Sequence, residues 1–396
     1  MTPEFLTLVV NPGSSSRKYA LYADDKMRAT LNFEFVDGKV TGKVGYNGQK
    51  YPRNYEDTDL NGVSRYVLPL LHEYEIIQKE DNLTAIGIRV VAPSMRFMED
   101  ELLTDEVEDA LKAVQQKAPL HITTALSEII QVKEHFPGTP LVAISDTAFH
   151  KTKQEFAWYY GVDTDLADKF GIKRYGYHGI SVGSVVHCLT EQNKLSPKTI
   201  ICHLGSGSSL TAVRDGKSVD TTMGYSPLEG LIMATRCGNI DVSAALAIKR
   251  ELSLSDDELE SYLNKKSGLI GISGSSNDIR QLLASEAQGD DKARLALGLL
   301  VYRIQQLIGQ MAASMGGVDS IVLTGTVGER SDVIRGRILD NLEYLGFSYD
   351  KETNHETFEP KEATNIATAT SKPILVISTD EAAEIARRTE QYIKNN

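Results

Sequence analysis

The sequence predicts an α/β protein of two similar lobes, and three observations lead to that prediction. Strand-like runs alternate with long helices of apolar periodicity along the chain. The length of 396 residues exceeds one ordinary domain and favours two. A strand, a Gly/Ser turn and a second strand occur twice, as LVVNPGSSSRKYAL from Leu8 and as IICHLGSGSSLTAV from Ile200. The two segments align without a gap, which indicates a weak internal duplication.

The first lobe is expected to begin with a meander of hairpins, because short β-favouring runs are separated by turns such as DGK and YNG. Its strands are Leu6–Val10, Tyr19–Tyr22, Ala29–Phe35 and Lys39–Gly45. A buried strand, two helices and another buried strand are then expected at Ala85–Val91, Leu102–Gln116, Thr123–Phe136 and Leu141–Ile144.

The second lobe is expected to repeat this start and to add long helices. Its strands are Thr199–His203, Leu210–Val213, Ser320–Leu323 and Ile374–Ile377. The segment TGTVGERSD follows the third strand as a loop that leads into a helix. The helix Arg294–Met315 ends at a glycine pair, and a well-capped helix after STDEAAE ends the chain.

Composition and charge exclude several classes of function. Lys and Arg number 42 against 54 Asp and Glu, and the net charge of −12 argues against nucleic acid or an anionic membrane as a main partner. The three cysteines, Cys188, Cys202 and Cys237, lack a CxxC spacing and indicate neither a disulfide framework nor a zinc site. The chain shows no signal peptide at its start and no apolar run of roughly 18 residues, so we expect a cytoplasmic protein.

The two Gly/Ser turns are candidate anion-binding loops. GSSSRK lacks the spacing of a Walker A loop, and GSGSSL is followed by a strand pattern where a dinucleotide-binding fingerprint needs a helix. A strand–turn–strand loop can still offer backbone N–H groups and hydroxyls to a phosphate. Ordinary β-turns remain the alternative for either loop alone. The further Gly-rich segment TGTVGE favours the phosphate interpretation.

A small set of charged residues stands in apolar or Gly-rich surroundings. Arg89 interrupts an apolar strand, where a charge needs either a buried ion pair or a polar cleft. Asp146 ends a strand, at the edge where α/β sheets bind ligands. His178 and Arg236 lie in Gly-broken segments, and Glu381 lies at a helix start, where capping is the commoner role. Together these residues suit phosphoryl transfer, in which cations stabilise the equatorial oxygens and carboxylates hold Mg²⁺.

Seven blocks spread over nearly the whole chain resemble the acetate kinase family, of the actin-like, sugar-kinase-like superfamily. They are NPGSSSRKY, KAPLH, DTAFH, RYGYHG, HLGSGSS, DTTMGYSPLEGLIMATRCGNID and LTGTVGE, in that order. The resemblance implies two duplicated actin-like, ribonuclease-H-like lobes with an active-site cleft between them. The first would comprise residues 1–148 with the C-terminal helix 379–396. The second, 149–378, would hold the phosphoryl-donor side and the contact of a homodimer.

The resemblance also implies an activity and assigns its residues. The activity is reversible in-line transfer between a small carboxylate and ATP/ADP, with Mg²⁺ or Mn²⁺. The catalytic residues would be Arg89, Asp146, His178 and Arg236. The substrate would lie against Asn11, Val91, Leu120, Tyr177 and Pro227, and the metal would be held by Asn11 and Glu381. Phosphate and nucleotide binding fall to Ser14, Ser16, Lys18, His203, Gly205, Ser206, Gly207, Asp278, Arg280, Gly325, Thr326 and Gly328.

Departures from the family pattern leave the phosphoryl partner open. This chain has RVVAPS where the family usually has RVVHGG, and PLHIT in place of PLHNP. It also has HLGSG in place of HLGNG and GTVGER in place of GGIGEN. A β-branched Thr326 in place of Gly removes space beside the expected adenosine, and Arg330 adds positive charge there. Inorganic pyrophosphate/phosphate is therefore the alternative to ATP/ADP, and a non-catalytic binding paralogue is a third possibility. Tyr177 replaces a family Phe, and acetate remains the expected acid, with propionate next.

Overall fold

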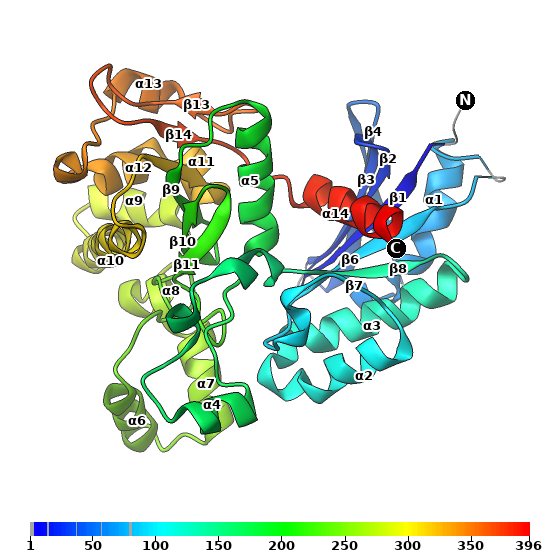
Figure 1. Cartoon of the computed structure of the whole chain (residues 1–396), viewed down its shortest axis with the longest axis horizontal. Helices are drawn as coiled ribbons and strands as arrows, with labels where there is room; N and C mark the ends of the chain where they lie inside the picture. Colours follow the sequence, from blue (N-terminus) through cyan, green and yellow to red (C-terminus); the bar gives the residue numbers. More distant parts are fainter. Residues whose placement is uncertain (1–3, 14–15, 37, 57, 79–80) are drawn as a thin grey trace. The chain divides into compact units, whose positions relative to one another are not determined.

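The computed structural model describes residues 4–13, 16–36, 38–56, 58–78 and 81–396. The chain divides into two compact units, Met1–Ala148 with Asp380–Asn396, and Phe149–Thr379. Each unit contains one mixed sheet flanked by helices, so the α/β prediction is confirmed (Figure 1). No helix in the described part of the chain is long and apolar enough to cross a bilayer.

The sheet of the first unit has the strand order β5-β4-β3-β2-β1-β6-β8-β7. Its strands are β1 (Leu6–Pro12), β2 (Ser16–Ala23), β3 (Lys26–Val36), β4 (Lys39–Tyr46), β5 (Gln49–Tyr55), β6 (Ala85–Val90), β7 (Glu101–Leu102) and β8 (Leu141–Ser145). The predicted meander is confirmed for β1 to β4. β5, which lacks buried residues, extends it by one strand.

Helices cover both faces of this sheet. They are η1 (Leu60–Tyr66), α1 (Val67–Glu73), η2 (Arg96–Met98), α2 (Asp105–Ala113), η3 (Gln115–Lys117), α3 (Pro119–His135) and α14 (Glu381–Asn395). α3 starts four residues before the predicted helix, with a proline in its first turn. α2 starts later than predicted, because Leu102 pairs in β7 and Thr104 caps the helix.

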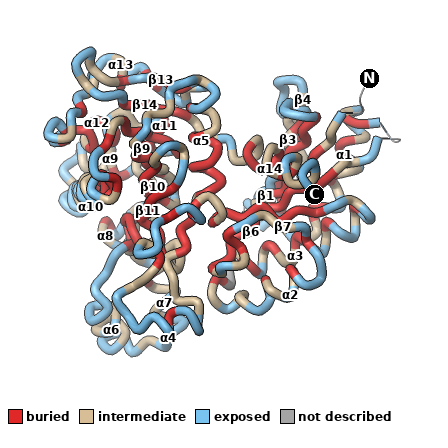
Figure 2. Tube along the Cα trace, in the orientation of Figure 1, coloured by how far each residue is buried: buried red, intermediate tan, exposed pale blue. Residues whose placement is uncertain are grey.

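The sheet of the second unit has the order β11-β10-β9-β12-β14-β13. Its strands are β9 (Lys198–Leu204), β10 (Ser208–Arg214), β11 (Lys217–Thr221), β12 (Ser320–Thr324), β13 (Thr364–Asn365) and β14 (Ile374–Val376). Two buried clusters lie on this sheet, one including α10 (Asp291–Met315) and one including α5 (Gly179–Glu191). Figure 2 shows the strands and α5 as buried and the outer helix α6 (Val242–Glu251) as largely exposed.

The helices of the second unit are η4 (Ala148–Thr152), η5 (Glu155–Trp158), α4 (Thr164–Phe170), α5 (Gly179–Glu191), α6 (Val242–Glu251), α7 (Asp256–Lys265), α8 (Gly268–Ser273), α9 (Ile279–Ala287), α10 (Asp291–Met315), α11 (Gly325–Arg330), α12 (Asp332–Leu339), η6 (Glu343–Leu345) and α13 (Lys351–Glu356). The segment GTVGER, predicted as a loop, is therefore itself the short helix α11. Gly325 makes this possible, because it adopts φ +77° at the strand-to-helix junction.

The internal duplication is confirmed by topology. In each sheet the first strand of the unit pairs antiparallel with the second and parallel with a later strand, as β1 does with β2 and β6 and β9 with β10 and β12. The gapless alignment of the two loops is wrong by one residue. Pro12 pairs with Arg17, whereas Leu204 pairs with Ser208. The first turn, 13–16, is thus one residue longer than the second, 205–207.

Candidate active site

Four predicted site residues meet in the first unit. Asn11 is near the end of β1, Arg89 lies in β6, Asp146 follows β8, and Glu381 begins α14. Because β1, β6 and β8 are neighbouring parallel strands, their carboxyl ends share one edge of the sheet. The sheet therefore assembles residues that lie up to 370 positions apart in sequence.

Arg89 is the centre of this cluster. Its Nη2 lies 3.2 Å from Asp146 Oδ2 and its Nη1 lies 3.5 Å from Glu381 Oε2. Nη1 also donates to Asn11 Oδ1 at 3.5 Å, and Asn11 Nδ2 donates to Glu381 Oε2 at 3.0 Å. Burial opposes the charge of Arg89, but the carboxylates of Asp146 and Glu381 outweigh it and raise the pKa of the guanidinium.

The cluster retains capacity to bind an anion. The side chain of Arg89 is 22% exposed, and its buried Nε–H has no acceptor among the described residues. Asp146 is 1% exposed, and its ion pair with Arg89 orients the guanidinium. The ion pair that the sequence suggested is therefore present, and it leaves a donor of Arg89 available to a carboxylate or phosphoryl oxygen.

The same cluster suits a hard divalent cation. Asn11 and Glu381 place an amide oxygen and a carboxylate side by side, and Mg²⁺ prefers such oxygen ligands. Among the described residues, no group of three or more His, Cys, Asp or Glu side chains could hold a metal. Mg²⁺ commonly takes only one or two carboxylates together with substrate phosphates, so this sparse donor set fits it.

A second cluster forms within the second unit around Gly207. A Cβ built on Gly207 would lie 3.3 Å from His178 Nε2 and 3.5 Å from Arg236 Nη1, so both side chains lie against this glycine. The rings of His178 and His203 are 4.7 Å apart, and His178 Nδ1 shares a 3.0 Å hydrogen bond with Ser209 Oγ. His178 adopts a left-handed φ of 60°, a conformation that is uncommon for a non-glycine residue.

Arg236 is attached to the second Gly/Ser turn through backbone bonds. Ala234 N donates to Ser206 O at 3.3 Å, and Gly205 N donates to Gly207 O at 3.2 Å. Arg236 Nη1 donates to Pro227 O at 3.4 Å, and burial lowers the pKa of its guanidinium. An arginine remains charged after such a shift, so Arg236 supplies a desolvated cation beside His178.

Tyr177 has its hydroxyl occupied. It is 1% exposed, and its OH donates to Tyr225 O at 2.6 Å, close in sequence to the predicted pocket residue Pro227. The hydroxyl therefore adds no free polar group to an acyl pocket. This hydrogen bond joins Tyr177 to the segment that contains Pro227.

The segment predicted for the nucleotide lies beside the second turn. A Cβ on Gly325 would lie 2.6 Å from Leu204 O, so α11 starts against the end of β9, and Gly328 is buried in the same helix. The side chain of Thr326 is exposed and that of Val327 packs on the core. Arg330 pairs with Glu359, so the positive charge expected there is compensated.

Sequence reasoning missed Glu329. Its Oε1 accepts from Gly325 N at 2.9 Å and its Oε2 accepts from Ser378 Oγ at 2.9 Å, so this carboxylate stabilises the start of α11. The sequence signal was the spacing Gly-x-x-x-Glu directly after an apolar strand. Asp278 caps α9 and pairs with the exposed Arg280 at 2.5 Å, and among the described residues this pair has no hydrogen bond or ion pair with the second turn.

The remaining predicted residues are less informative. Ser14 and the side chain of Leu120 lie outside the described part of the chain. Ser16 accepts from Gly13 N at 2.9 Å, the exposed Lys18 lies opposite Asn11 in the hairpin, and Val91 is buried after β6.

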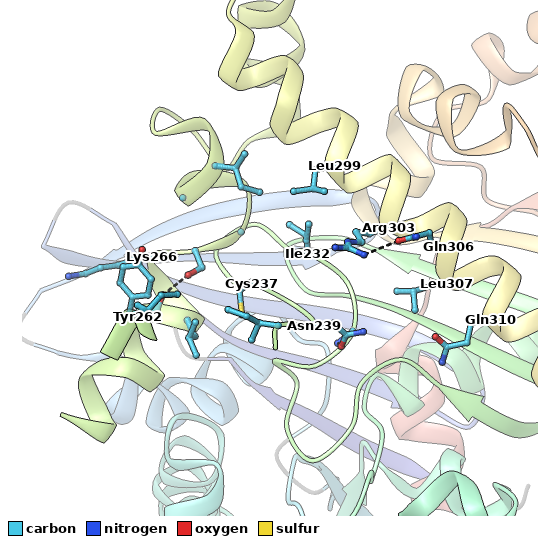
Figure 3. Close-up of a pocket in the computed structure, with 18 residues that line it drawn as sticks. Ile232, Cys237, Asn239, Tyr262, Lys266, Leu299, Arg303, Gln306, Leu307 and Gln310 are labelled. Atoms are coloured by element: carbon cyan, nitrogen blue, oxygen red, sulfur yellow. Dashed lines mark hydrogen bonds between the residues drawn. The ribbon is translucent and has the colours of Figure 1, made fainter. Parts of the chain in front are cut away.

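A cavity of about 550 Å³ is lined by residues that flank Arg236 in the sequence (Figure 3). Ile232, Cys237 and Asn239 of that segment line it, facing Leu299, Arg303 and Leu307 of α10. Arg303 donates to Gln306 at 2.9 Å. None of the predicted site residues lines this cavity.

Comparison with known proteins decides the family. The model of the acetokinase family matches residues 6–387. The chain belongs to the acetokinase family. An acetate kinase of Clostridium novyi is 40% identical over 98% of both chains, and one of Clostridium botulinum is 40% identical over 97% of this chain and 98% of the other.

Solved structures agree with this assignment. An acetate kinase of Porphyromonas gingivalis has a TM-score of 0.88 at 31% identity, covering 98% of this chain and 99% of the other. A propionate kinase of Francisella tularensis has a TM-score of 0.89 at 34% identity over the same shares. This family member is accordingly a phosphotransferase of the acetate kinase type, with a carboxyl group as acceptor.

Proposed function

We propose that the chain catalyses reversible transfer of a phosphoryl group between ATP and acetate, forming acetyl phosphate and ADP. The observation that supports this most strongly is Arg89, held by Asp146 and Glu381 with its Nε–H directed to no acceptor among the described residues. Membership of the acetokinase family supports the reaction class. The desolvated Arg236 beside His178 supplies further positive charge and donors for a phosphoryl group.

In the proposed reaction a carboxylate oxygen of acetate attacks the terminal phosphorus of ATP. The new O–P bond forms as the bond to the bridging β,γ-oxygen breaks, and that electron pair leaves with ADP. Arg89 and Arg236 stabilise the charge on the equatorial oxygens, and His178 donates to one of them. Asp146 keeps the Arg89 guanidinium in orientation. Mg²⁺ or Mn²⁺, held by Asn11 and Glu381, would neutralise phosphate charge.

The acid is proposed to be acetate, with propionate as the nearest alternative. Tyr177 gives its hydroxyl to Tyr225 O, so no polar group of this side chain favours a hydroxylated acid. Val91 is 8% exposed and offers an apolar side chain in the first unit. One methylene in an apolar pocket discriminates by only roughly 10- to 200-fold, so both acids should turn over.

One observation supports pyrophosphate as a second candidate donor. A cavity whose lining includes Gly205 of the second turn and Val327 of α11 has a volume of about 10 Å³, too small for a purine. Against it, the Arg330 charge is paired with Glu359 and the Thr326 side chain is exposed. We therefore rank ATP first.

A hydroxamate assay of acetyl phosphate tests both points. Acetate or propionate is combined with ATP or pyrophosphate, with Mg²⁺, with Mn²⁺ or with a chelator in place of the metal. We expect turnover with acetate, ATP and metal, a lower kcat/KM with propionate, and none with the chelator. Turnover with pyrophosphate alone would replace ATP in the proposal. Absence of hydroxamate in every combination would contradict the function.

We further propose a homodimer through the second unit. α6 has no buried residue and exposes Val242, 73% accessible, and Leu246, 44% accessible. An uncovered apolar helix favours a protein partner. Light scattering of Val242→Glu/Leu246→Lys should then give half the mass of the wild type, and an unchanged mass would reject this face.

The free cysteines among the described residues accord with a cytoplasmic location.

A further inference from the structure

A buried ion pair outside the predicted set lies behind the first Gly/Ser turn. Arg17 is 3% exposed and its Nε lies 2.9 Å from Oε2 of Glu128, which is 0% exposed. Burying two charges costs desolvation free energy, and an apolar pair of similar volume often serves stability as well or better. The geometry around Arg17 therefore needs a reason other than core stability.

Arg17 grips both ends of the turn. Its Nη1 donates to the carbonyl oxygens of Gly13 and Ser16, the latter at 3.2 Å, while Nη2 donates to Asn61 Oδ1 at 3.1 Å. Gly13 and Ser16 bracket the phosphate-loop segment, and Gly13 N also donates to Ser16 O at 2.9 Å. One planar guanidinium thus fixes the separation of the two loop ends, which a lysine could not do in the same way.

Glu128 fixes the guanidinium in turn. Its Oε1 accepts from the hydroxyl of Tyr19, a residue of β2 that is 1% exposed, so both carboxylate oxygens are bonded. Glu128 lies in α3, whose first turn contains Leu120. Burial raises the pKa of Glu128, and the contacts with Tyr19 and Arg17 oppose that shift. The pair therefore connects the turn to the helix whose first turn contains the predicted acyl-pocket residue Leu120.

The second unit holds the corresponding carbonyl by a smaller group. By strand pairing, Ser208 corresponds to Arg17 and Gly205 to Gly13. Ser208 Oγ donates to Gly205 O at 3.2 Å, as Arg17 does to Gly13 O. A hydroxyl is sufficient for the three-residue turn. In the longer first turn, the guanidinium of Arg17 reaches both Gly13 O and Ser16 O.

We propose that Arg17 is a positioning residue that fixes Gly13 and Ser16, at the two ends of the first turn, for binding of the transferring phosphoryl group, and that Glu128 holds Arg17. This inference rests on the proposed function. Arg17 acts through the carbonyl groups of Gly13 and Ser16 and touches no reacting atom in the proposed reaction. Its loss should raise the KM for acetyl phosphate and lower kcat, because a small displacement of binding groups is enough to slow a positioned reaction.

The test separates positioning from folding with a paired variant. Arg17→Met/Glu128→Leu removes both charges and keeps the volume. It leaves the Tyr19 hydroxyl without its acceptor, so the fold should persist with a Tm somewhat below that of the wild type. We expect an increase of about 10-fold in the KM for acetyl phosphate and a fall of about 10-fold in kcat. Hydrogen exchange should accelerate in residues 11–19 and stay unchanged in 203–210. Arg28→Met, which breaks the exposed pair with Glu4, is the control.

A folded double variant with wild-type KM, kcat and exchange in 11–19 overturns the inference, as does a lower Tm with unchanged kinetics. If the double variant does not fold, Arg17→Lys decides by the same readouts, since it keeps the charge and loses the fork. Hydrogen exchange keeps this inference distinct from the proposed function. A wild type that forms no acetyl phosphate contradicts the function, whereas the exchange of 11–19 still reports on Arg17.

Discussion

The two Gly/Ser turns have the same place in two sheets of the same topology and different supports. The first is gripped by the buried Arg17–Glu128 pair, and the second by the hydroxyl of Ser208. Beside the first turn lie carboxylates around one arginine, and beside the second lie His178 and Arg236. The two units therefore share a strand arrangement but carry different side chains beside the corresponding turns.

The largest expected effect is the loss of activity when either Arg89 or Arg236 is removed. Arg89→Ala and Arg236→Ala should each lower kcat/KM by about 10³-fold or more, because each removes a cation from a developing phosphoryl charge. Their effects on stability should differ. Arg89→Ala leaves the buried Asp146 without its cation and should lower the free energy of unfolding by about 3 kcal/mol. Burial already opposes the charge of Arg236, so its loss should cost little stability.

Steady-state kinetics and urea unfolding check this pair, with Arg28→Ala and Arg294→Ala as controls. Both controls break exposed ion pairs, with Glu4 and with Asp291, and should leave activity and stability near those of the wild type. Equal losses of stability in Arg89→Ala and Arg236→Ala would contradict the contrast between the clusters.

A methyl group at Gly207 probes the second cluster alone. Gly207→Ala places a Cβ 3.3 Å from His178 Nε2 and should reduce kcat by roughly 10-fold, because the neighbouring side chains must shift slightly. Thermal unfolding should change little. Gly298→Ala in α10 is the control, because its Cβ would meet no atom within 4 Å and alanine favours a helix. Full activity in Gly207→Ala would show that His178 and Arg236 tolerate movement.

Ser208→Ala measures the support of the second turn. The variant loses the hydroxyl that donates to Gly205 O and accepts from Gly205 N, each at 3.2 Å. The free energy of unfolding should fall by about 1 kcal/mol, and kcat should change less than in Arg17→Met/Glu128→Leu. Denaturant titration and kinetics give both values. A larger fall in kcat in Ser208→Ala than in Arg17→Met/Glu128→Leu would contradict the greater importance of Arg17.

A further comparison, without a predicted effect on activity, concerns pH and stability in the second unit. Burial, followed by the nearby Arg174, lowers the pKa of Lys153 to about 7. Between that value and the ordinary lysine pKa, the unfolded chain binds more protons than the folded one, so stability rises with pH. The free energy of unfolding of the wild type relative to Lys153→Met should increase by about 2–3 kcal/mol from pH 7.5 to 9.5. Lys151→Met is the exposed control, and a flat difference would contradict the shift.

Sequence alone predicted much of the frame because its signals are local. The hairpin at Leu8, the buried strand with Arg89 and the helix ending at Gly316 each follow from turn residues or periodicity. The family resemblance then selected Asn11, Asp146 and Glu381, which the structure brings together around Arg89.

The missed features depend on distant partners. Arg17 is followed directly by Lys18, and nothing local distinguishes a buried from an exposed cation there. Its partner Glu128 lies 111 positions away. The one-residue difference between the turns depends on strand pairing, which a gapless alignment cannot detect. Helix α11 depends on the positive φ of Gly325 and on Glu329, whose contact forms only once the helix exists.

The most direct test of the central claim is ³¹P NMR of acetyl phosphate mixed with ADP, Mg²⁺ and the protein. The account predicts that the acetyl phosphate resonance decays while the γ-phosphate resonance of ATP grows in equal amount, with the transfer greatly slowed in Arg89→Ala and in Arg236→Ala. Accumulation of orthophosphate in place of ATP, or an unchanged spectrum with the wild-type protein, would contradict it.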